Sequence, residues 1–256
     1  MDINVTILGS GTAVPSLQRS ACSVMMEINR HTIVFDSGPG TMRRLLEAGK
    51  TLNHISHIFY SHFHPDHTSE MIPVLFATRY HEPLKRQGGI TLTGGNRFLE
   101  FFDRLKHAYG NWMAPEPDFL TLIEMNPDEK PEMTHDDFTV RVAKVAHADE
   151  SVAYRISTSS GKSVVYSGDT DFSENLIELS KNADLLICET AFPDEFKKDK
   201  HSTPAIAGEM AEKAGVRKLV ITHFYPVCEK VDLAKQCRRA YSGPLILAED
   251  LLRIRV

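Results

Sequence analysis

Three histidines and one aspartate lie within six residues, just after an apolar run that predicts a strand over Ile55–Tyr60. The polar segment reads His62-Phe63-His64-Pro65-Asp66-His67. Because alternate side chains of an extended segment point the same way, His62 and His64 should converge on one ion. Pro65 breaks the extended run and lets Asp66 and His67 turn toward a second ion. Imidazole nitrogens and carboxylate oxygens suit zinc, iron or manganese, so the segment predicts a metal site, with two ions favoured.

Three later strand-like segments each lead to one more residue that can bind a metal. These are Phe138–Ala146 with His147, Ser163–Gly168 with Asp169, and Lys218–Thr222 with His223. The patterns indicate strands, so each candidate stands at the carboxyl end of its own strand. Taken singly, each histidine would be read as a solvated strand-end residue and the aspartate as a turn former. Their agreement favours ligands that complete two coordination spheres.

Together these motifs resemble the metallo-β-lactamase superfamily, which is marked by a His-x-His-x-Asp-His loop, a further histidine, a strand-end aspartate and a final histidine. The resemblance covers the whole chain and implies an α/β fold, the four-layer αββα sandwich, built as a single domain over residues 1–256. Zinc is the expected metal, with manganese or iron as alternatives. The resemblance assigns one metal to His62, His64 and His147, a second to Asp66, His67 and His223, and a bridging role to Asp169.

Two further features resemble ribonuclease Z within this superfamily. In the first, Glu189 stands at a strand end, and His201 lies just before a helix start at Thr203 and Pro204. In ribonuclease Z the matching glutamate orients the matching histidine, which acts at the leaving-group side of a phosphodiester. Without the resemblance, Glu189 would be read as a helix or turn carboxylate and His201 as a capping or surface residue.

The second feature is a pair of glycine-containing turns, Leu8–Ser16 and Asp36–Thr41, which also resemble ribonuclease Z segments. Glycine lets the backbone approach a metal centre closely and present its amides to an anion. Asp36 is expected to orient a metal ligand without touching the metal. Because tight turns need glycine anyway, these turns are weaker evidence than the histidine motifs.

The chain departs from the ribonuclease Z enzymes that mature transfer RNA. Those enzymes carry a long glycine- and proline-rich arm between the first histidine motif and the next ligand. The corresponding stretch, about Glu82 to Pro131, offers instead Ile90–Thr93, a helix near 98–108 and a loop with Tyr109, Trp112 and Phe119. The net charge of -5 gives no general attraction for RNA, and the best local basic group is Lys197, Lys198 and Lys200.

We therefore expect a two-metal phosphodiesterase whose partner is a small phosphodiester or nucleotide, with RNA not favoured. A hydroxide supplied by the metals would attack, Asp66 could take a proton, and His201, held by Glu189, would protonate the leaving oxygen. Alternatives are a tRNA 3′-processing endoribonuclease, a lactonase, a sulfatase, a thioester hydrolase and a non-catalytic metal-binding module. A flavin-dependent diiron reductase would need an attached flavodoxin domain, which is not seen.

Composition is that of an ordinary globular protein, with 42% hydrophobic and 25% charged residues. Neither a signal peptide nor an apolar run of membrane length is visible, so we expect a cytoplasmic protein without a membrane partner, and a homodimer is left open. The scattered cysteines, Cys22, Cys188, Cys228 and Cys237, are expected to be reduced and mostly buried. The remaining histidines are interpreted as surface or packing residues: His31, His54, His57, His81, His107 and His135.

The hydrophobic pattern divides the chain into two halves, each with strands and helices. Strands are predicted near 3–8, 22–28, 32–36, 55–60, 138–146, 152–158, 162–167, 184–188 and 218–222. Helices are predicted near 41–48, 70–80, 97–109, 173–181, 204–214 and 232–240. Two sheets packed face to face, with these helices outside, would bury the apolar strand faces and gather the ligands along one edge.

Overall fold

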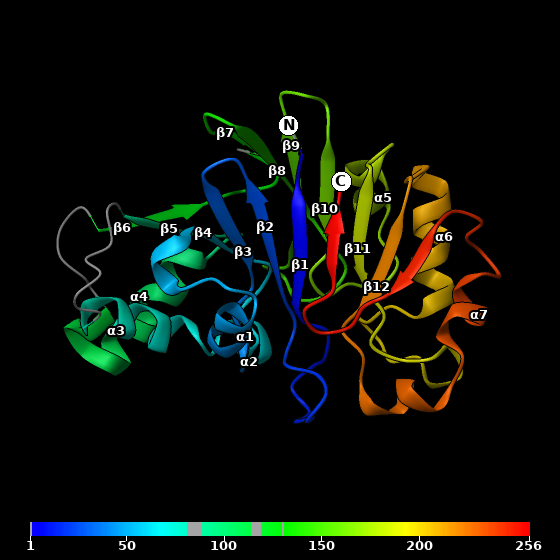
Figure 1. The fold of residues 1–256 in the computed structure, drawn as a ribbon, viewed down its shortest axis with the longest axis horizontal. Helices are drawn as coiled ribbons and strands as arrows, with labels where there is room; N and C mark the ends of the chain where they lie inside the picture. Colours follow the sequence, from blue (N-terminus) through cyan, green and yellow to red (C-terminus); the bar gives the residue numbers. More distant parts are fainter. Residues whose placement is uncertain (1, 81–88, 114–118, 130) are drawn as a thin grey trace.

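Two β-sheets lie face to face, with helices on their outer sides (Figure 1). The computed structural model describes residues 2–80, 89–113, 119–129 and 131–256. In this part of the chain each sheet has seven strands, in the orders β14-β1-β2-β3-β4-β5-β6 and β13-β12-β11-β10-β9-β8-β7. The predicted αββα sandwich is therefore confirmed.

The first sheet comes mainly from the amino-terminal half of the chain. Its strands are β1 (Asn4–Gly9), β2 (Ser23–Ile28), β3 (His31–Phe35), β4 (Ile55–Tyr60), β5 (Ile90–Gly94), β6 (Leu120–Glu124) and β14 (Arg253–Arg255). Its accompanying helices are α1 (Thr41–Glu47), α2 (Pro65–Thr68), α3 (Met71–Tyr80) and α4 (Phe98–Tyr109), with 3₁₀ turns at Leu52–His54 and Gly110–Met113.

The second sheet comes from the carboxy-terminal half. Its strands are β7 (Glu132–Thr134), β8 (Phe138–Lys144), β9 (Val152–Thr158), β10 (Ser163–Tyr166), β11 (Leu185–Glu189), β12 (Leu219–Thr222) and β13 (Leu245–Leu247). Its helices are α5 (Glu174–Ser180), α6 (Pro204–Ala214) and α7 (Leu233–Cys237), with 3₁₀ turns at Asp194–Phe196 and Pro226–Lys230.

Parallel pairing places the ends of several strands at one edge of the sandwich. Strand β4 runs parallel to β3 and β5, and β11 runs parallel to β10 and β12. Strand β11 is buried along its whole length, as expected for a strand between parallel neighbours under helices. The loops after β4, β10, β11 and β12 therefore emerge close together, and a predicted site residue lies at or within three residues of each strand end.

Helix α6 begins and ends as the sequence predicts. The Thr203 hydroxyl accepts a hydrogen bond from the Ile206 amide at 3.5 Å, and Pro204 occupies the first turn. Gly215 ends the helix with a left-handed φ of 63°, which glycine adopts without steric cost. This helix start fixes the segment that carries His201.

Several short elements were not predicted, and one predicted strand is shorter than expected. Strands β7, β13 and β14 have three residues each, too few for a periodic signal. Strand β8 was predicted to reach Ala146 but ends at Lys144, because the Val145 amide bonds to the Ser151 carbonyl and closes a turn. His147 thus lies on a loop and not directly at a strand end. Helix α7 is likewise shorter than the predicted 232–240.

The stretch predicted to replace the RNA-binding arm holds ordinary elements of the fold where it is described. Residues 89–113 and 119–129 form β5, α4, a 3₁₀ turn and β6. The expectations for His81, Glu82 and the Trp112 side chain fall outside the described residues. No helix in the described ranges combines the length and apolar character that a membrane crossing requires.

Residues given a packing role behave mostly as predicted. All four cysteines are buried and free. The rings of His31, His57 and His135 pack around Phe138, with centroid separations of 5.3, 5.5 and 4.5 Å. These histidines extend the aromatic core between the sheets.

Candidate metal centre

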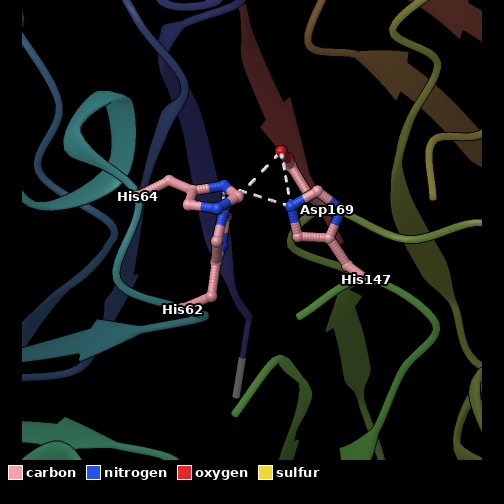
Figure 2. A group of neighbouring side chains, drawn as sticks. All are labelled: His62, His64, His147 and Asp169. Carbon is pink, nitrogen blue, oxygen red and sulfur yellow. Dashed lines mark hydrogen bonds and ion pairs between the residues drawn. The ribbon is translucent and has the colours of Figure 1, made fainter. Parts of the chain in front are cut away.

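Three histidines converge with Asp169 at the edge where β4 ends (Figure 2). His62 Nε2 lies 3.0 Å from His64 Nδ1, and His147 Nε2 lies 3.1 Å from the same His64 atom. His62 and His64 point the same way, as their alternation predicts, and His147 arrives from the loop after β8. The ligand atoms of this group lie within 4.8 Å of one another, close enough to hold one ion.

A second group contains Asp66, His67 and His223. Pro65 starts the one-turn helix α2, which directs Asp66 and His67 away from the first group. Asp66 Oδ2 lies 3.6 Å from His223 Nε2 and 3.8 Å from His67 Nε2. His223, in the left-handed region with a φ of 66°, follows β12 directly. This group also meets the spacing for one ion.

Asp169 lies between the two groups and presents one carboxylate oxygen to each. Its Oδ1 is 3.3 Å from both His67 Nε2 and His223 Nε2. Its Oδ2 is 3.8 Å from His62 Nε2 and 3.9 Å from His147 Nε2. This arrangement is what a carboxylate that bridges two ions requires.

The unpaired atoms of the cluster test whether cations fit there. Among the described residues, His67 Nε2, His223 Nε2 and Asp169 Oδ1 are buried and have no hydrogen-bond partner. Buried polar atoms are nearly always paired, so such atoms facing one another indicate a place for a cation. Imidazole and carboxylate donors suit divalent transition metals, and the residues present therefore fit two such ions.

The second ring nitrogen of each of three histidines is held from outside the cluster. His67 Nδ1 lies 2.7 Å from Asp36 Oδ2, and His147 Nδ1 lies 2.7 Å from the Lys200 carbonyl oxygen. His62 Nδ1 lies 3.0 Å from the hydroxyl of its neighbour Ser61. Such contacts fix the ring orientation and the tautomer, which leaves the other nitrogen free to bind a metal.

Asp36 was predicted to orient a metal ligand, and in the structure its contact is with His67. The residue is fully buried and left-handed, with a φ of 57°. Its Oδ1 accepts from the Ser61 amide at 2.7 Å, and its Oδ2 accepts from the Ser61 and Tyr166 hydroxyls at 2.7 and 2.6 Å. Asp36 thus links the end of β3, the histidine loop and β10. Gly38 nearby leaves no room for a side chain, since a Cβ would lie 1.8 Å from the Asp66 carbonyl oxygen.

Replacing Asp36 with asparagine should weaken metal binding without removing a ligand. Every group around the carboxylate donates, so an amide nitrogen in place of either oxygen would face a donor. We expect metal affinity to fall about 10- to 100-fold and the free energy of unfolding to fall by about 1–3 kcal/mol. Chelator competition and thermal unfolding measure the two effects. The control is Asp128→Asn in an exposed turn, and equal metal affinity in the two variants would contradict the role of Asp36.

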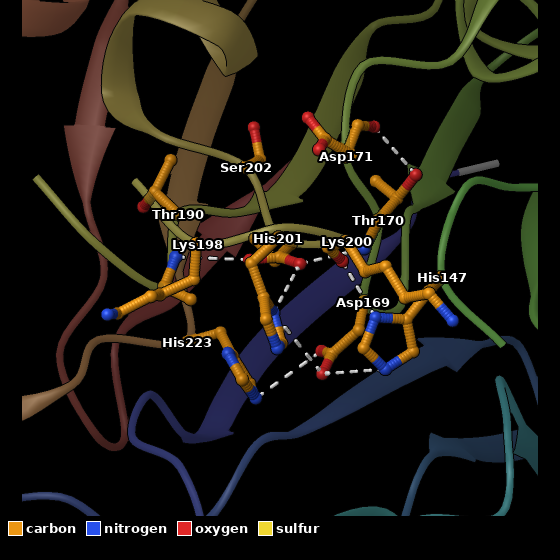
Figure 3. Close-up of polar contacts among 12 residues, drawn as sticks. His147, Asp169, Thr170, Asp171, Thr190, Lys198, Lys200, His201, Ser202 and His223 are labelled. Atoms are coloured by element: carbon orange, nitrogen blue, oxygen red, sulfur yellow. Dashed lines mark hydrogen bonds and ion pairs between the residues drawn. The ribbon is translucent and has the colours of Figure 1, made fainter. Parts of the chain in front are cut away.

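Glu189 and His201 form a pair. Figure 3 shows His201 beside the proposed ligands Asp169 and His223. Glu189 Oε1 lies 3.0 Å from His201 Nδ1 and accepts from the Thr170 amide at 2.8 Å, while Oε2 accepts from the Ala191 amide at 3.0 Å. His201 Nδ1 also lies 3.9 Å from Asp169 Oδ2. Its Nε2 makes no hydrogen bond within the described ranges. The His201 side chain is 18% exposed and that of Glu189 1%, so the pair joins a buried carboxylate to a ring at the surface of the site.

Burial and neighbouring charges set the protonation of these groups. Burial lowers the pKa of His62 well below its ordinary value, which keeps it a neutral ligand. Burial alone would raise the pKa of Asp66, but contact with His223 and the charge of His67 lower it to about 2. Burial also lowers the pKa of His201, yet the Glu189 carboxylate outweighs this effect and leaves the pKa above its ordinary value. His201 therefore keeps its proton more readily than a free histidine.

An aromatic pair that the sequence did not single out borders His201. The rings of Phe192 and Tyr225 stack at 4.6 Å with an interplanar angle of 17°, and they lie 5.9 and 6.5 Å from the His201 ring. Their only signal in the sequence is proximity, because Phe192 follows Glu189 by three residues and Tyr225 follows His223 by two. They restrict the space around the proposed proton donor.

Nine predicted site residues thus come together at one edge of the sandwich. The family description Beta-lactamase superfamily domain matches residues 31–224. The chain therefore belongs to the metallo-β-lactamase superfamily. Ribonuclease Z of Methanosarcina acetivorans is 27% identical over 312 aligned positions, covering 99% of this chain and 98% of the relative. This similarity runs over nearly the whole of both chains, in keeping with the resemblance to ribonuclease Z.

Two crystal structures share the fold. The metallo-beta-lactamase fold protein YhfI from Bacillus subtilis superimposes with a TM-score of 0.85, at 24% identity and with 100% of both chains covered. The short form of human tRNase Z superimposes with a TM-score of 0.77, at 24% identity and with 98% of both chains covered. The alignment with the Methanosarcina acetivorans relative is longer than the 256 residues of this chain, so that relative contains segments the chain lacks.

Proposed function

We propose that the protein is a two-metal phosphodiesterase that acts on small phosphodiesters or nucleotides. The observation that carries the proposal is the Glu189–His201 pair, with His201 Nδ1 3.0 Å from the glutamate and 3.9 Å from Asp169. A metal pair can support hydrolysis with its ligands alone. A histidine that is held beside those ligands adds a group that can protonate a departing oxygen. Membership of the metal-dependent family supports the hydrolase class.

Each of the two groups of side chains is proposed to bind one metal. One metal would be held by His62, His64 and His147, the other by Asp66, His67 and His223, with Asp169 contacting both. Zinc is the proposed metal, with manganese or iron as alternatives. Two bound cations would lower the pKa of a water molecule and offset the negative charge on the phosphoryl oxygens.

The chain's own residues then orient the substrate and move protons. Glu189 holds His201 through Nδ1, so Nε2 is the nitrogen that would give its proton to the leaving oxygen. Asp66 would be the carboxylate that accepts a proton from the attacking water. Because its pKa of about 2 makes it a weak base, we assign it first as a ligand and second as a proton acceptor.

RNA cleavage is the second candidate function, since the Methanosarcina acetivorans relative is named ribonuclease Z. The Lys197–Lys200 loop offers some support, because it runs directly to His201. Lys197 is already paired with Asp171 at 2.6 Å, and in the described part of the chain only Lys198 and Lys200 of this loop remain without an ion pair. With a net charge of -5, two exposed lysines favour a small substrate over a long RNA.

One panel of substrates tests the proposal. Metal-reconstituted protein should hydrolyse a chromogenic phosphodiester faster than a thioester, a lactone or a sulfate ester, and faster than a precursor transfer RNA. Moderate salt screens weak charge contacts, so that only specific recognition persists. Protein stripped by a chelator is the control and should be inactive on all five. Faster turnover of the thioester, lactone or sulfate would reject the phosphodiesterase, and faster cleavage of the transfer RNA would establish the second candidate.

A further inference from the structure

A cavity of about 750 Å³ opens beside the second metal group, between the loop that joins β1 to β2 and the segment after β12. We call it the side cavity, and its lining includes Val14, Leu17, Gln18, Pro226 and Glu249. Its volume falls within the range of about 300–1,000 Å³ that small-molecule sites occupy. It contains none of the proposed ligands or the Glu189–His201 pair.

The walls of the side cavity are attached directly to two proposed ligands. On one side, the Ala13 amide donates to Asp66 Oδ2 at 3.1 Å. On the other side, Phe224 follows His223 in the chain and donates its amide to the Ser10 carbonyl at 2.9 Å. The side cavity therefore borders the residues that are proposed to hold the second metal.

The arginines that line the side cavity are already paired with neighbouring carboxylates. Arg19 pairs with Glu229 at 2.6 Å, donates to the Ser10 hydroxyl and the Ala248 carbonyl at 2.6 and 2.8 Å, and lies 4.9 Å over the Phe224 ring. Arg44 is paired with Asp250 at 2.9 Å and with Glu47 at 2.7 Å. Both positive charges are neutralised by carboxylates, so the cavity lining offers no unpaired cation for a second phosphate.

The groups left available are hydrogen-bonding and apolar. The Glu249 carboxylate and the Gln18 amide nitrogen make no hydrogen bond or ion pair to any described residue. Leu17 is 94% exposed and Val14 40%, so apolar surface faces the solvent at the mouth. An unpaired carboxylate beside apolar surface suits a flat ligand that is uncharged and carries an amine.

We infer that the side cavity binds the nucleobase of a nucleotide substrate, and that Glu249 accepts a hydrogen bond from an amine on that base. This inference rests on the proposed function, because it assigns the part of the substrate next to the phosphodiester. The metal groups take the phosphate, the apolar mouth covers the base, and the carboxylate selects bases with an exocyclic amine.

Equilibrium binding to the metal-loaded protein tests the inference without turnover. Adenosine 5′-monophosphate should bind up to about tenfold more tightly than purine riboside 5′-monophosphate, which lacks the amine and has no other donor in its place, since a hydrogen bond to a charged group contributes at most about this much at an exposed carboxylate such as Glu249. Ribose 5-phosphate, which lacks the base, should bind more weakly than either. Glu249→Ala should abolish the preference for adenosine, and Ser16→Trp, which fills the cavity, should reduce nucleotide binding to the level of ribose 5-phosphate. Glu129→Ala, which removes a charge from a distant turn, is the control for Glu249→Ala.

Two results would overturn the inference. One is equal affinity of the unmodified protein for adenosine 5′-monophosphate and ribose 5-phosphate. The other is a base preference that survives both Glu249→Ala and Ser16→Trp. Failure of the proposed function is a separate result, seen as absent diester hydrolysis, and it leaves these binding measurements decisive for the side cavity.

Discussion

Asp169→Ala should leave the protein with at most one metal ion per chain and without measurable phosphodiesterase activity. Its two oxygens face different histidine pairs, Oδ1 toward His67 and His223 at 3.3 Å, and Oδ2 toward His62 and His147 at 3.8 and 3.9 Å. Loss of one group that stabilises transition-state charge commonly lowers kcat by about 10²- to 10³-fold. Removing a residue shared by both ions should exceed that effect.

Elemental analysis and steady-state kinetics on the same preparation check this prediction. The control is Asp128→Ala, which removes an exposed carboxylate and should retain two ions and full activity. If the Asp169→Ala protein kept two ions and normal turnover, the carboxylate would have no bridging role. One ion per chain in fully loaded unmodified protein would likewise reject the paired centre.

His201→Ala should retain both metals and lose about 10²- to 10⁴-fold in turnover of substrates with a poor leaving group, the usual contribution of a general acid. The loss should be small when the leaving group is p-nitrophenolate, which departs without a proton. In His201→Ala, turnover of a dinucleotide, whose leaving group is an alkoxide, should therefore fall much more than turnover of the p-nitrophenyl ester of the same nucleotide. Metal content and the ratio of the two rates are the measurements.

Two further variants complete this comparison, one at the residue that holds His201 and one at an unrelated histidine. Glu189→Gln keeps the shape of the holder but removes its charge, so it should show the same leaving-group dependence with a smaller loss. His107→Ala removes an exposed histidine on α4 and should change neither rate. An equal loss on both substrates in His201→Ala would assign this histidine to positioning the substrate and not to proton transfer.

The histidine loop could be predicted because its information is local. Alternation in an extended segment aligns His62 with His64, and Pro65 forces the turn that separates Asp66 and His67 from them. The strands that lead to Asp169 and His223 are buried along their length and have a clear apolar pattern. The layered fold follows from the same patterns, since apolar strands and amphipathic helices have few ways to pack.

Features that depend on distant partners could not be predicted. The bond between His147 and the Lys200 carbonyl joins residues 53 positions apart, and Tyr166 reaches Asp36 across 130 positions. The edge strand β14 has only three residues and forms because β1, at the other end of the chain, supplies its partner. Composition and spacing carry no record of such pairings, which arise only when the sheets assemble.

The Lys200 carbonyl couples the position of a proposed metal ligand to the position of the proposed proton donor. It holds His147, a proposed ligand, at 2.7 Å, and the next residue in the chain is His201, the proposed proton donor. Lys200 is itself left-handed, with a φ of 67°, so this peptide has little freedom to relax. Any sequence change that tilts the loop to suit a different leaving group would also rotate the His147 ring. Divergence of substrate preference in this loop should therefore be accompanied by altered metal retention, and homologous chains that differ there should differ in both properties together.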